Sequence, residues 1–211
     1  MRLRAGVVAA TVAAALGLGG CGSATDTTPS DDADDPYRPT GTPSATVAMG
    51  EGPAAYSEVE GSGFTISAPG EFQQQRTTSR NGEPMLVLET PSRVTAVPQR
   101  VVVIRDTAPR APATQQSFAL ETLKSSSGTS REVHRTSVPG LVDELPPAIL
   151  VSWRERRAGA GASTVEVTYW QLFQQVGDDL ILNVVALAPT AEFETSEVSR
   201  ILRTFVPDTD G

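Results

Sequence analysis

Residues 169–189, YWQLFQQVGDDLILNVVALAP, decide the fold class of this chain. Two runs rich in aliphatic and aromatic residues flank the short polar turn VGDD (176–179). Runs of this length and composition predict strands, here at 164–175 and 180–188, and the turn between them is typical of a hairpin. Strands joined by so short a turn run antiparallel. The segment therefore predicts an antiparallel sheet.

Further strands are expected on the N-terminal side of this hairpin. The chain there contains short runs enriched in Val and Ile and bounded by Pro and Gly, such as GFTISA before Pro69 and Gly70. Enrichment in β-branched residues with such punctuation favours strands over helices when the runs are short. The expected strands are 63–68, 85–90, 100–106, 131–138 and 148–156.

Two amphipathic helices are expected as well. The first, at 114–125, is followed by Ser and Gly; the second, at 191–204, has two glutamates near its N-terminal end, where the helix dipole favours them. A one-sided apolar stripe predicts that each helix packs on the sheet. The stripes are Ala119, Leu120 and Leu123, with Phe118 at the edge, in the first helix and Val198, Ile201, Leu202 and Phe205 in the second.

Strands broken by two helices, without regular alternation of strand and helix, predict an α+β fold. We expect an antiparallel sheet of about six or seven strands with two main helices packed on one or both of its faces. Residues 58–206 carry 17 acidic and 14 basic residues, a net charge of −3 over 149 residues. A chain of this length buries about two thirds of its unfolded surface. We therefore expect a single domain at 58–207 and a short tail at 208–211.

Three segments of the domain carry a resemblance to a known family. They are GFTISAPGEF (63–72), the hairpin 169–189 and EVSRILRTFVP (197–207). In the order of elements and in their aromatic and aliphatic positions, they resemble the PsbP-like fold, which is named for an extrinsic photosystem subunit and shared with LpqN-type bacterial lipoproteins. That family is largely non-enzymatic. The resemblance implies a binding or assembly module and provides no catalytic residues.

The N-terminus has the three parts of a secretory signal. Two arginines precede an uncharged stretch rich in Ala and Val (5–20), and small residues lead to the only cysteine, Cys21. As a helix this stretch would be roughly 24 Å long, shorter than the roughly 30 Å hydrocarbon core of a bilayer, so cleavage is favoured over a permanent span. The residues LGGC (18–21) resemble the bacterial lipobox. This resemblance implies cleavage between Gly20 and Cys21 and a diacylglyceryl group on the Cys21 thiol.

The alternative is a general secretory signal with an incidental cysteine. That arrangement would leave an unpaired thiol open to oxidation and cross-linking, whereas an acylated cysteine has no thiol left to react. Two acyl chains also give anchoring that a single chain cannot sustain. We therefore expect residues 1–20 to be a signal peptide and the mature protein to be lipid-anchored at the extracytoplasmic face of the cell membrane.

Residues 21–57 are expected to be the lipidated cysteine and a disordered tether. Ser, Thr, Pro, Gly, Ala and Asp dominate this segment, which cannot bury enough apolar surface to order itself. Its net charge of −5 over 22–57 should be repelled by anionic lipids, so the acyl chains must hold the protein. The acidic run DDADD (31–35) lacks the ligand spacing of an EF-hand and indicates a solvated spacer.

Charge and residue counts exclude several classes of protein. The 211 residues carry a formal net charge of −8 with a pI near 4.7, which disfavours a nucleic-acid partner. With one cysteine and one histidine, the sequence offers no zinc-ligand set, and no nucleotide-binding loop is present, so we expect no metal and no cofactor. His134 could act with Asp143 in a Ser-His-Asp hydrolase, but the G-x-S-x-G elbow is absent. We expect no catalytic residues and interpret His134 as a strand histidine.

Arg154, Arg156 and Arg157 form the densest basic cluster. Strand alternation puts Arg154 and Arg156 on one face of the sheet and Glu155 and Arg157 on the other. Two interpretations stay open. The cluster could bind a phosphate or a carboxylate, or it could be a solvated strand end that includes its own counter-charge.

Two functions of different class remain open. The domain can be a non-catalytic binding or assembly module that recognises another envelope protein through the exposed face of its sheet. Alternatively, it carries a small hydrophobic or lipid ligand between sheet and helix. Trp153 and Trp170 are expected in the core, or one of them lines such a ligand cleft. A large apolar cavity would favour the carrier, and a filled core with an exposed apolar patch would favour the module.

Overall fold

The computed structural model describes residues 35–39, 48–91, 97–139, 142, 144–159 and 163–209. The predicted signal peptide, the cleavage point at Gly20 and Cys21, most of the predicted tether and Asp143 lie outside these residues. The segment Pro36–Gly211 forms one compact unit. Within the described part of the chain, no helix combines the length and the hydropathy that crossing a membrane requires.

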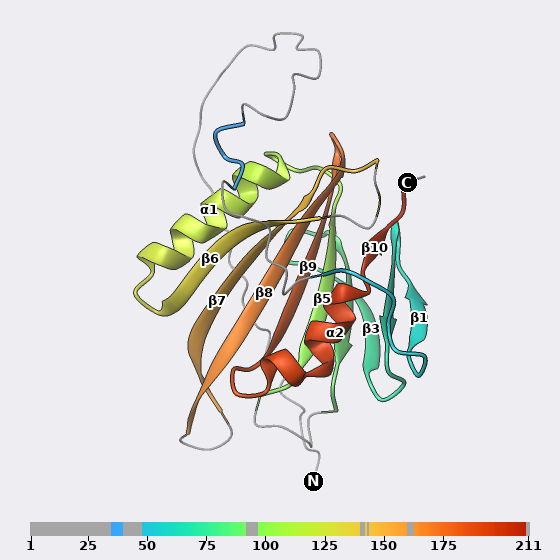
Figure 1. The fold of residues 1–211 in the computed structure, drawn as a ribbon, viewed down its shortest axis with the longest axis vertical. Coiled ribbons are helices and arrows are strands. Elements are labelled where there is room, and N and C mark those ends of the chain that lie inside the picture. The colour runs from blue at the N-terminus through green and yellow to red at the C-terminus, as the bar shows by residue number, and fades with distance from the viewer. Residues whose placement is uncertain are drawn as a thin grey trace. The chain divides into compact units, whose positions relative to one another are not determined.

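A seven-stranded antiparallel sheet forms the centre of the domain (Figure 1). The strands lie in the order β3-β4-β5-β9-β8-β7-β6, and every neighbouring pair is antiparallel. The predicted hairpin is β8 and β9, whose pairing closes at Gly177 and Leu180 around the two aspartates of the turn. The α+β class is confirmed. The strands are β3 (Gln73–Thr78), β4 (Pro84–Glu89), β5 (Arg100–Asp106), β6 (Ser130–Val138), β7 (Ala148–Ala158), β8 (Thr164–Gly177) and β9 (Leu180–Pro189).

Three short strands form a second sheet in the order β1-β2-β10. They are β1 (Ser57–Glu60), β2 (Phe64–Ala68) and β10 (Val206–Pro207), and both outer strands run antiparallel to β2. The small sheet brings the N-terminal and C-terminal parts of the domain together. Because Phe64, Ile66 and Ala68 of β2 are buried, it adds a second layer over one end of the main sheet.

The two helices lie on opposite faces of the main sheet. The first, α1 (Ala113–Ser126), contacts β6, β7 and β8, whereas α2 (Glu197–Arg203) contacts β9, β5 and β2. Successive residues of β7 point to opposite faces of the sheet: Val151 packs in the cluster on the α1 side, and Leu150 packs in the cluster on the α2 side. The sheet is therefore covered on both faces.

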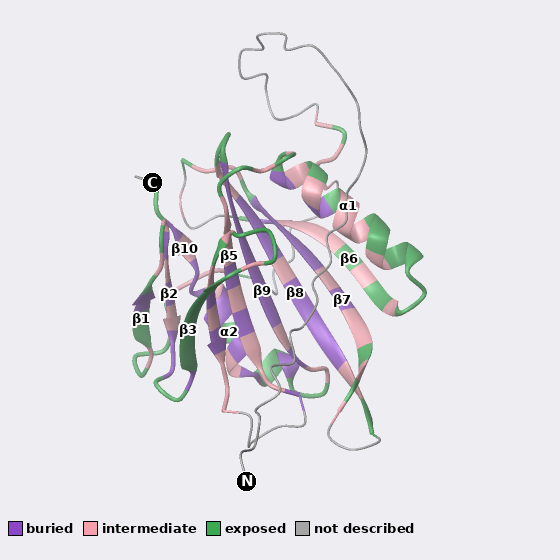
Figure 2. Ribbon diagram, turned by 180° about the vertical axis from the view of Figure 1, so that it is seen from behind, coloured by how far each residue is buried: buried purple, intermediate pink, exposed green. Residues whose placement is uncertain are grey.

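The larger core lies between the main sheet, α2 and the small sheet. Its fully buried side chains come from all three layers, and burial is concentrated on the central strands while β3 is exposed (Figure 2). Full burial of one such side chain contributes about 1.5–3 kcal/mol. This core fixes the sheet against α2. Its members with under 2% exposure include Ile66, Leu88, Leu172, Leu182, Ile201 and Leu202.

The expected packing face of the first helix is right for Leu120, which packs against the sheet, and wrong for Leu123 and Phe118. Leu123 is 51% exposed and Phe118 41% exposed, whereas Ala113 and Ser117 are buried and Leu120 is half-buried. Positions 113, 117 and 120 follow the four- and three-residue spacing of one helix face, so this face lies on the sheet. The apolar pattern of the sequence does not identify this face because one of its buried residues, Ser117, is polar. The Ser117 hydroxyl is satisfied locally, since it donates to the Thr114 carbonyl over 2.8 Å.

The second helix is shorter than the predicted 191–204. A 3-10 turn, η3 (Phe193–Thr195), comes first, and Ser196 is extended at φ −74° and ψ 155°. The Ser196 hydroxyl donates to the Phe193 carbonyl over 2.6 Å, and the buried Phe193 ring packs edge-on against Trp170. Because of these contacts, the helix begins only at Glu197. The predicted stripe is confirmed, because Val198, Ile201, Leu202 and Phe205 are all at most 1% exposed.

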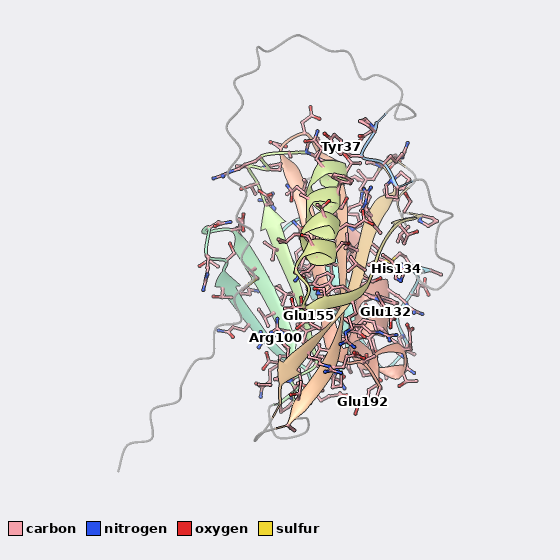
Figure 3. The ribbon with its side chains drawn as sticks, turned by 90° about the vertical axis from the view of Figure 1, so that its left-hand side faces the viewer. Tyr37, Arg100, Glu132, His134, Glu155 and Glu192 are labelled. Atoms are coloured by element: carbon pink, nitrogen blue, oxygen red, sulfur yellow. The ribbon has the colours of Figure 1, made fainter. Side chains whose placement is uncertain are left out.

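Some residues before position 58 also contact the domain. Tyr37 lies against α1, where its ring meets that of Phe118 edge-on at 5.4 Å (Figure 3). The Arg135 guanidinium donates to the Tyr37 carbonyl over 2.5 Å. Further along, Met49 and Tyr56 pack against the larger core. These contacts fall inside the range that composition assigns to the tether.

Candidate anion-binding site

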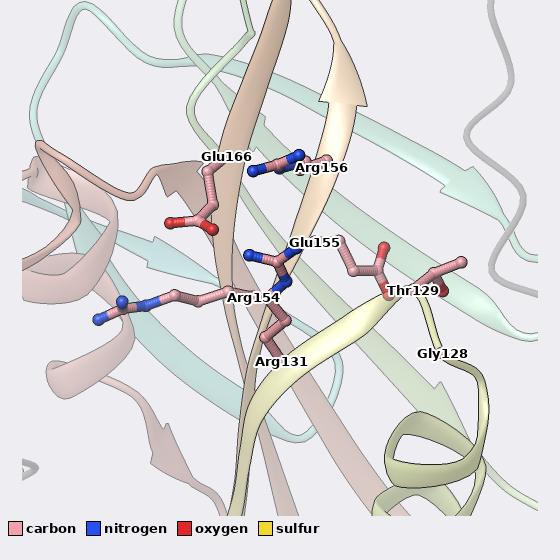
Figure 4. Close-up of a pocket in the computed structure, with 7 residues that line it drawn as sticks. All are labelled: Gly128, Thr129, Arg131, Arg154, Glu155, Arg156 and Glu166. Carbon is pink, nitrogen blue, oxygen red and sulfur yellow. The ribbon is translucent and has the colours of Figure 1, made fainter.

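A hollow of about 200 Å³ opens where the end of α1 leads into β6, beside β7 and β8 (Figure 4). We call it the arginine hollow. Three of its side chains are guanidinium groups, and the turn after α1 contributes backbone at its rim. It is lined by Gly128, Thr129, Arg131, Arg154, Glu155, Arg156 and Glu166.

Strand alternation along β7 divides the predicted arginine cluster. Glu155 forms an ion pair with Lys124 of α1, and the Arg157 guanidinium lies 5.2 Å from the Tyr169 ring centroid, so both side chains are on the α1 face. Arg154 and Arg156 lie on the opposite face and line the hollow. The predicted alternation is confirmed, and Arg157 does not belong to the site.

Arg131 enters the hollow because β6 contains a β-bulge. Arg131 pairs with Arg154 and His134 pairs with Ser152, so β6 has one more residue between these positions than β7. Without the extra residue, Arg131 and Val133 would point to the same face. Val133 instead packs in the cluster below α1, while Arg131 turns to the hollow. The bulge therefore places a third arginine beside Arg154 and Arg156.

The backbone at this bulge is unusual. Glu132 has φ 49°, in the left-handed region, and it is the only non-glycine residue with a positive φ among those that the structure describes. A side chain with a Cβ pays about 1–2 kcal/mol for this conformation. The Glu132 carboxylate accepts a hydrogen bond from Arg154 over 2.8 Å. The strained residue thus holds one of the three arginines at the side of the hollow.

The other two arginines have no such partner. Within the described ranges, the Arg131 and Arg156 guanidiniums make no ion pair and no hydrogen bond, and both residues are exposed. Glu166 is the cross-strand neighbour of Arg156, but their charged groups lie beyond salt-bridge distance. Figure 4 shows the Arg131, Arg156 and Glu166 side chains around one space. Ten N–H donors, five for each guanidinium, are therefore available to a ligand.

A polar network on the α1 side fixes the wall of the hollow. The Glu155 carboxylate accepts from Lys124 Nζ over 2.6 Å, from Trp153 Nε1 over 2.9 Å and from the Ser130 hydroxyl over 3.2 Å. Burial alone would raise the pKa of Glu155, but these hydrogen bonds and the Lys124 charge outweigh burial and hold the pKa below its usual value. Lys124 also lies 4.6 Å from the Trp153 ring centroid. The network ties α1 to β6 and β7.

The tryptophans are in the core, as expected. Trp153 is 4% exposed and stacks on Tyr169 at 4.9 Å with an interplanar angle of 5°. Trp170 is 6% exposed and packs on the opposite face against Phe193. Neither belongs to the hollow.

The single histidine lies outside the hollow as well. His134 is exposed on β6, beyond Glu132 along the strand (Figure 3). Asp143, its expected partner in a hydrolase, is not among the described residues. Across the part of the chain that the structure describes, no three His, Cys, Asp or Glu side chains gather as a metal site would require.

Comparisons with known proteins assign no family to the chain. No family model matches the chain, and no curated protein matches it. One solved structure, a protein from Bacteroides thetaiotaomicron VPI-5482, is similar over 69% of this chain and 45% of its own chain, with 10% sequence identity and a TM-score of 0.41. The chain thus spans less than half the length of that protein. At this TM-score, the similarity assigns neither a family nor a function to the chain.

Proposed function

We propose that the protein is a non-catalytic binding module of the cell envelope, held at the extracytoplasmic face of the membrane by a diacylglyceryl group on Cys21. The observation that carries its binding role is the pair of guanidiniums at an open hollow, Arg131 and Arg156, neither of which has a partner among the residues that the structure describes. Guanidinium groups stay protonated at every physiological pH, so they hold an anion without exchanging protons with it. This chemistry suits binding better than catalysis.

The filled core supports the binding module over the alternative, a carrier of a small hydrophobic or lipid ligand. Side chains from the sheet and α2 that a carrier would need to separate, such as Leu172, Leu182 and Ile201, are at most 1% exposed and pack together. The antiparallel sheet with a helix on each face also supports the proposed resemblance to the PsbP-like fold of LpqN-type lipoproteins.

Photo-cross-linking in intact cells tests the binding role. A photoreactive amino acid replaces Thr129 at the rim of the hollow. A matched variant carries it at the exposed Arg110, which precedes the N-terminal end of the 14-residue helix α1, whereas the hollow follows its C-terminal end. We expect a discrete adduct from position 129 and none from position 110. Equal adducts from both positions, or no adduct at 129, would contradict a binding module that uses this hollow.

A further inference from the structure

We infer that the arginine hollow binds a phosphate group. This inference rests on the proposed function and names the chemistry of its ligand. Two guanidiniums that have no partner in the described part of the chain, Arg131 on β6 and Arg156 on β7, face the hollow. Arg154 lies beside them in its pair with Glu132. The three come from adjacent strands, so the sheet itself sets their spacing.

The number of donors favours phosphate over carboxylate. One guanidinium fork already satisfies both oxygens of a carboxylate in a bidentate pair. A phosphate group has at least three accessible oxygens and can accept from two forks at once. The hollow has about 200 Å³, several times the roughly 30 Å³ that one water occupies in the liquid, so it has room for a phosphate with some of its water.

Glu166 limits the charge that the hollow accepts. Its half-buried carboxylate shares the space with Arg131 and Arg156 without pairing with either. Two charges at the hollow are compensated, because Glu155 pairs with Lys124 and Arg154 pairs with Glu132. The remaining charges are the positive Arg131 and Arg156 and the negative Glu166. A single phosphate group therefore fits the local charge, and removal of the Glu166 charge should tighten phosphate binding.

The ligand can come from the membrane or from solution. Tyr37 contacts α1 only 16 residues after Cys21. A stretch of 16 residues can extend at most about 53–58 Å, which exceeds the roughly 21 Å length of α1. A hollow at the far end of α1 is therefore within reach of headgroup phosphates. A soluble phosphate ester presents the same chemistry.

The test uses the mature chain from residue 21 with Cys21→Ser, so that no acyl chain contributes. Inorganic phosphate is titrated by calorimetry and NMR at constant ionic strength, and sedimentation measures binding to phosphatidylglycerol vesicles. Arg131→Gln and Arg156→Gln should each weaken phosphate binding about tenfold, the loss expected for a charge-assisted hydrogen-bonded pair. Glu166→Gln should tighten binding, and Arg110→Gln, which removes the same charge elsewhere, should leave it unchanged.

The outcomes distinguish a membrane source of the phosphate ligand from a soluble one. They also distinguish failure of the phosphate inference from failure of the proposed binding role. A headgroup ligand is supported if the protein binds to vesicles, if inorganic phosphate competes with this binding and if Arg156→Gln abolishes it. Binding of inorganic phosphate without binding to vesicles supports a soluble ester. If phosphate fails to bind, or binds all variants equally, the inference is overturned. A cross-link from position 129 in cells would then still support the binding module, with a ligand of another class.

Discussion

At the scale of single residues, Glu132 holds a backbone conformation that side chains with a Cβ rarely adopt. Its φ of 49° lies in the region that Asn tolerates and β-branched residues avoid. Glu132 already bears about 1–2 kcal/mol of this strain, and a β-branched side chain fits the region still less well, so we predict that Glu132→Val lowers the free energy of unfolding by about another 1 kcal/mol. Glu132→Asn should cost less than half as much, although both variants lose the exposed ion pair with Arg154. Urea unfolding measures both, and equal losses would contradict strain at this bulge.

The buried Tyr169 and the half-buried Tyr56 differ in how their hydroxyls are satisfied. Tyr169 is 4% exposed, its hydroxyl has no hydrogen-bond partner among the described residues, and burial raises its pKa to about 12. Tyr56 donates to the Glu197 carboxylate. We predict that Tyr169→Phe leaves the free energy of unfolding unchanged or raises it by about 1 kcal/mol, while Tyr56→Phe lowers it by about 1 kcal/mol. Urea unfolding of the two variants compares them directly, and a larger loss for Tyr169→Phe would contradict the orphaned hydroxyl.

At the scale of elements, α1 is tied to the sheet by polar contacts as much as by apolar ones. Only Ala113 and Ser117 of the helix are buried, and Lys124, the only lysine of the chain, pairs with Glu155 of β7. A depressed carboxyl pKa stabilises the fold above the pKa of the unfolded chain, and this stabilisation is lost as the pH falls through the folded pKa.

We therefore predict that Glu155→Gln lowers the free energy of unfolding near neutral pH by about 1–2 kcal/mol. It should also flatten the fall of stability below about pH 4.5, the ordinary pKa of a glutamate, because there the unfolded chain binds a proton that the folded Glu155 carboxylate still resists. Glu58→Gln, at an exposed position of β1, removes the same charge and serves as the control. Urea unfolding between pH 3 and pH 7 gives both profiles. Parallel curves for Glu155→Gln and wild type would contradict the stabilising network.

The sequence predicts the strands that have an apolar face and misses those that do not. Six of the seven strands of the main sheet are predicted to within two residues at each end. The missing one, β3, reads QQQRTT, is exposed throughout and depends on its pairing with β4. The short β1 and β10 are missed as well, because pairing with β2 over two to four residues leaves no periodic signal.

The same limit applies to the candidate site. The cluster of Arg154, Arg156 and Arg157 is visible in the sequence, and alternation separates Arg157 from the other two. Arg131 is missed because a one-residue bulge reverses the face to which it points, and such a bulge has no clear sequence signal. Glu166 joins the site through strand pairing with Arg156, which only the register of β7 and β8 defines.

At the scale of the whole molecule, the anchor and the hollow form one proposal. Cys21→Ala removes the only cysteine of the sequence and with it the proposed acylation site. We predict that this variant moves from the membrane fraction to the soluble fraction or accumulates with its signal peptide uncleaved. Fractionation and immunoblotting measure the shift, and Thr27→Ala, a nearby change that leaves Cys21 in place, is the control. If Cys21→Ala fractionates like wild type, the lipid anchor is contradicted.

The most direct test of the central claim is native mass spectrometry of the mature chain with Cys21→Ser after incubation with an extract of its own cell envelope. The measured mass is compared with the calculated bare mass for this chain and for versions that also carry Arg131→Gln with Arg156→Gln, or Arg110→Gln alone. We predict an added mass that the Arg110→Gln chain retains and the doubly substituted chain loses. A bare mass throughout, or the same adduct on all three chains, would contradict a binding module that acts through the arginine hollow.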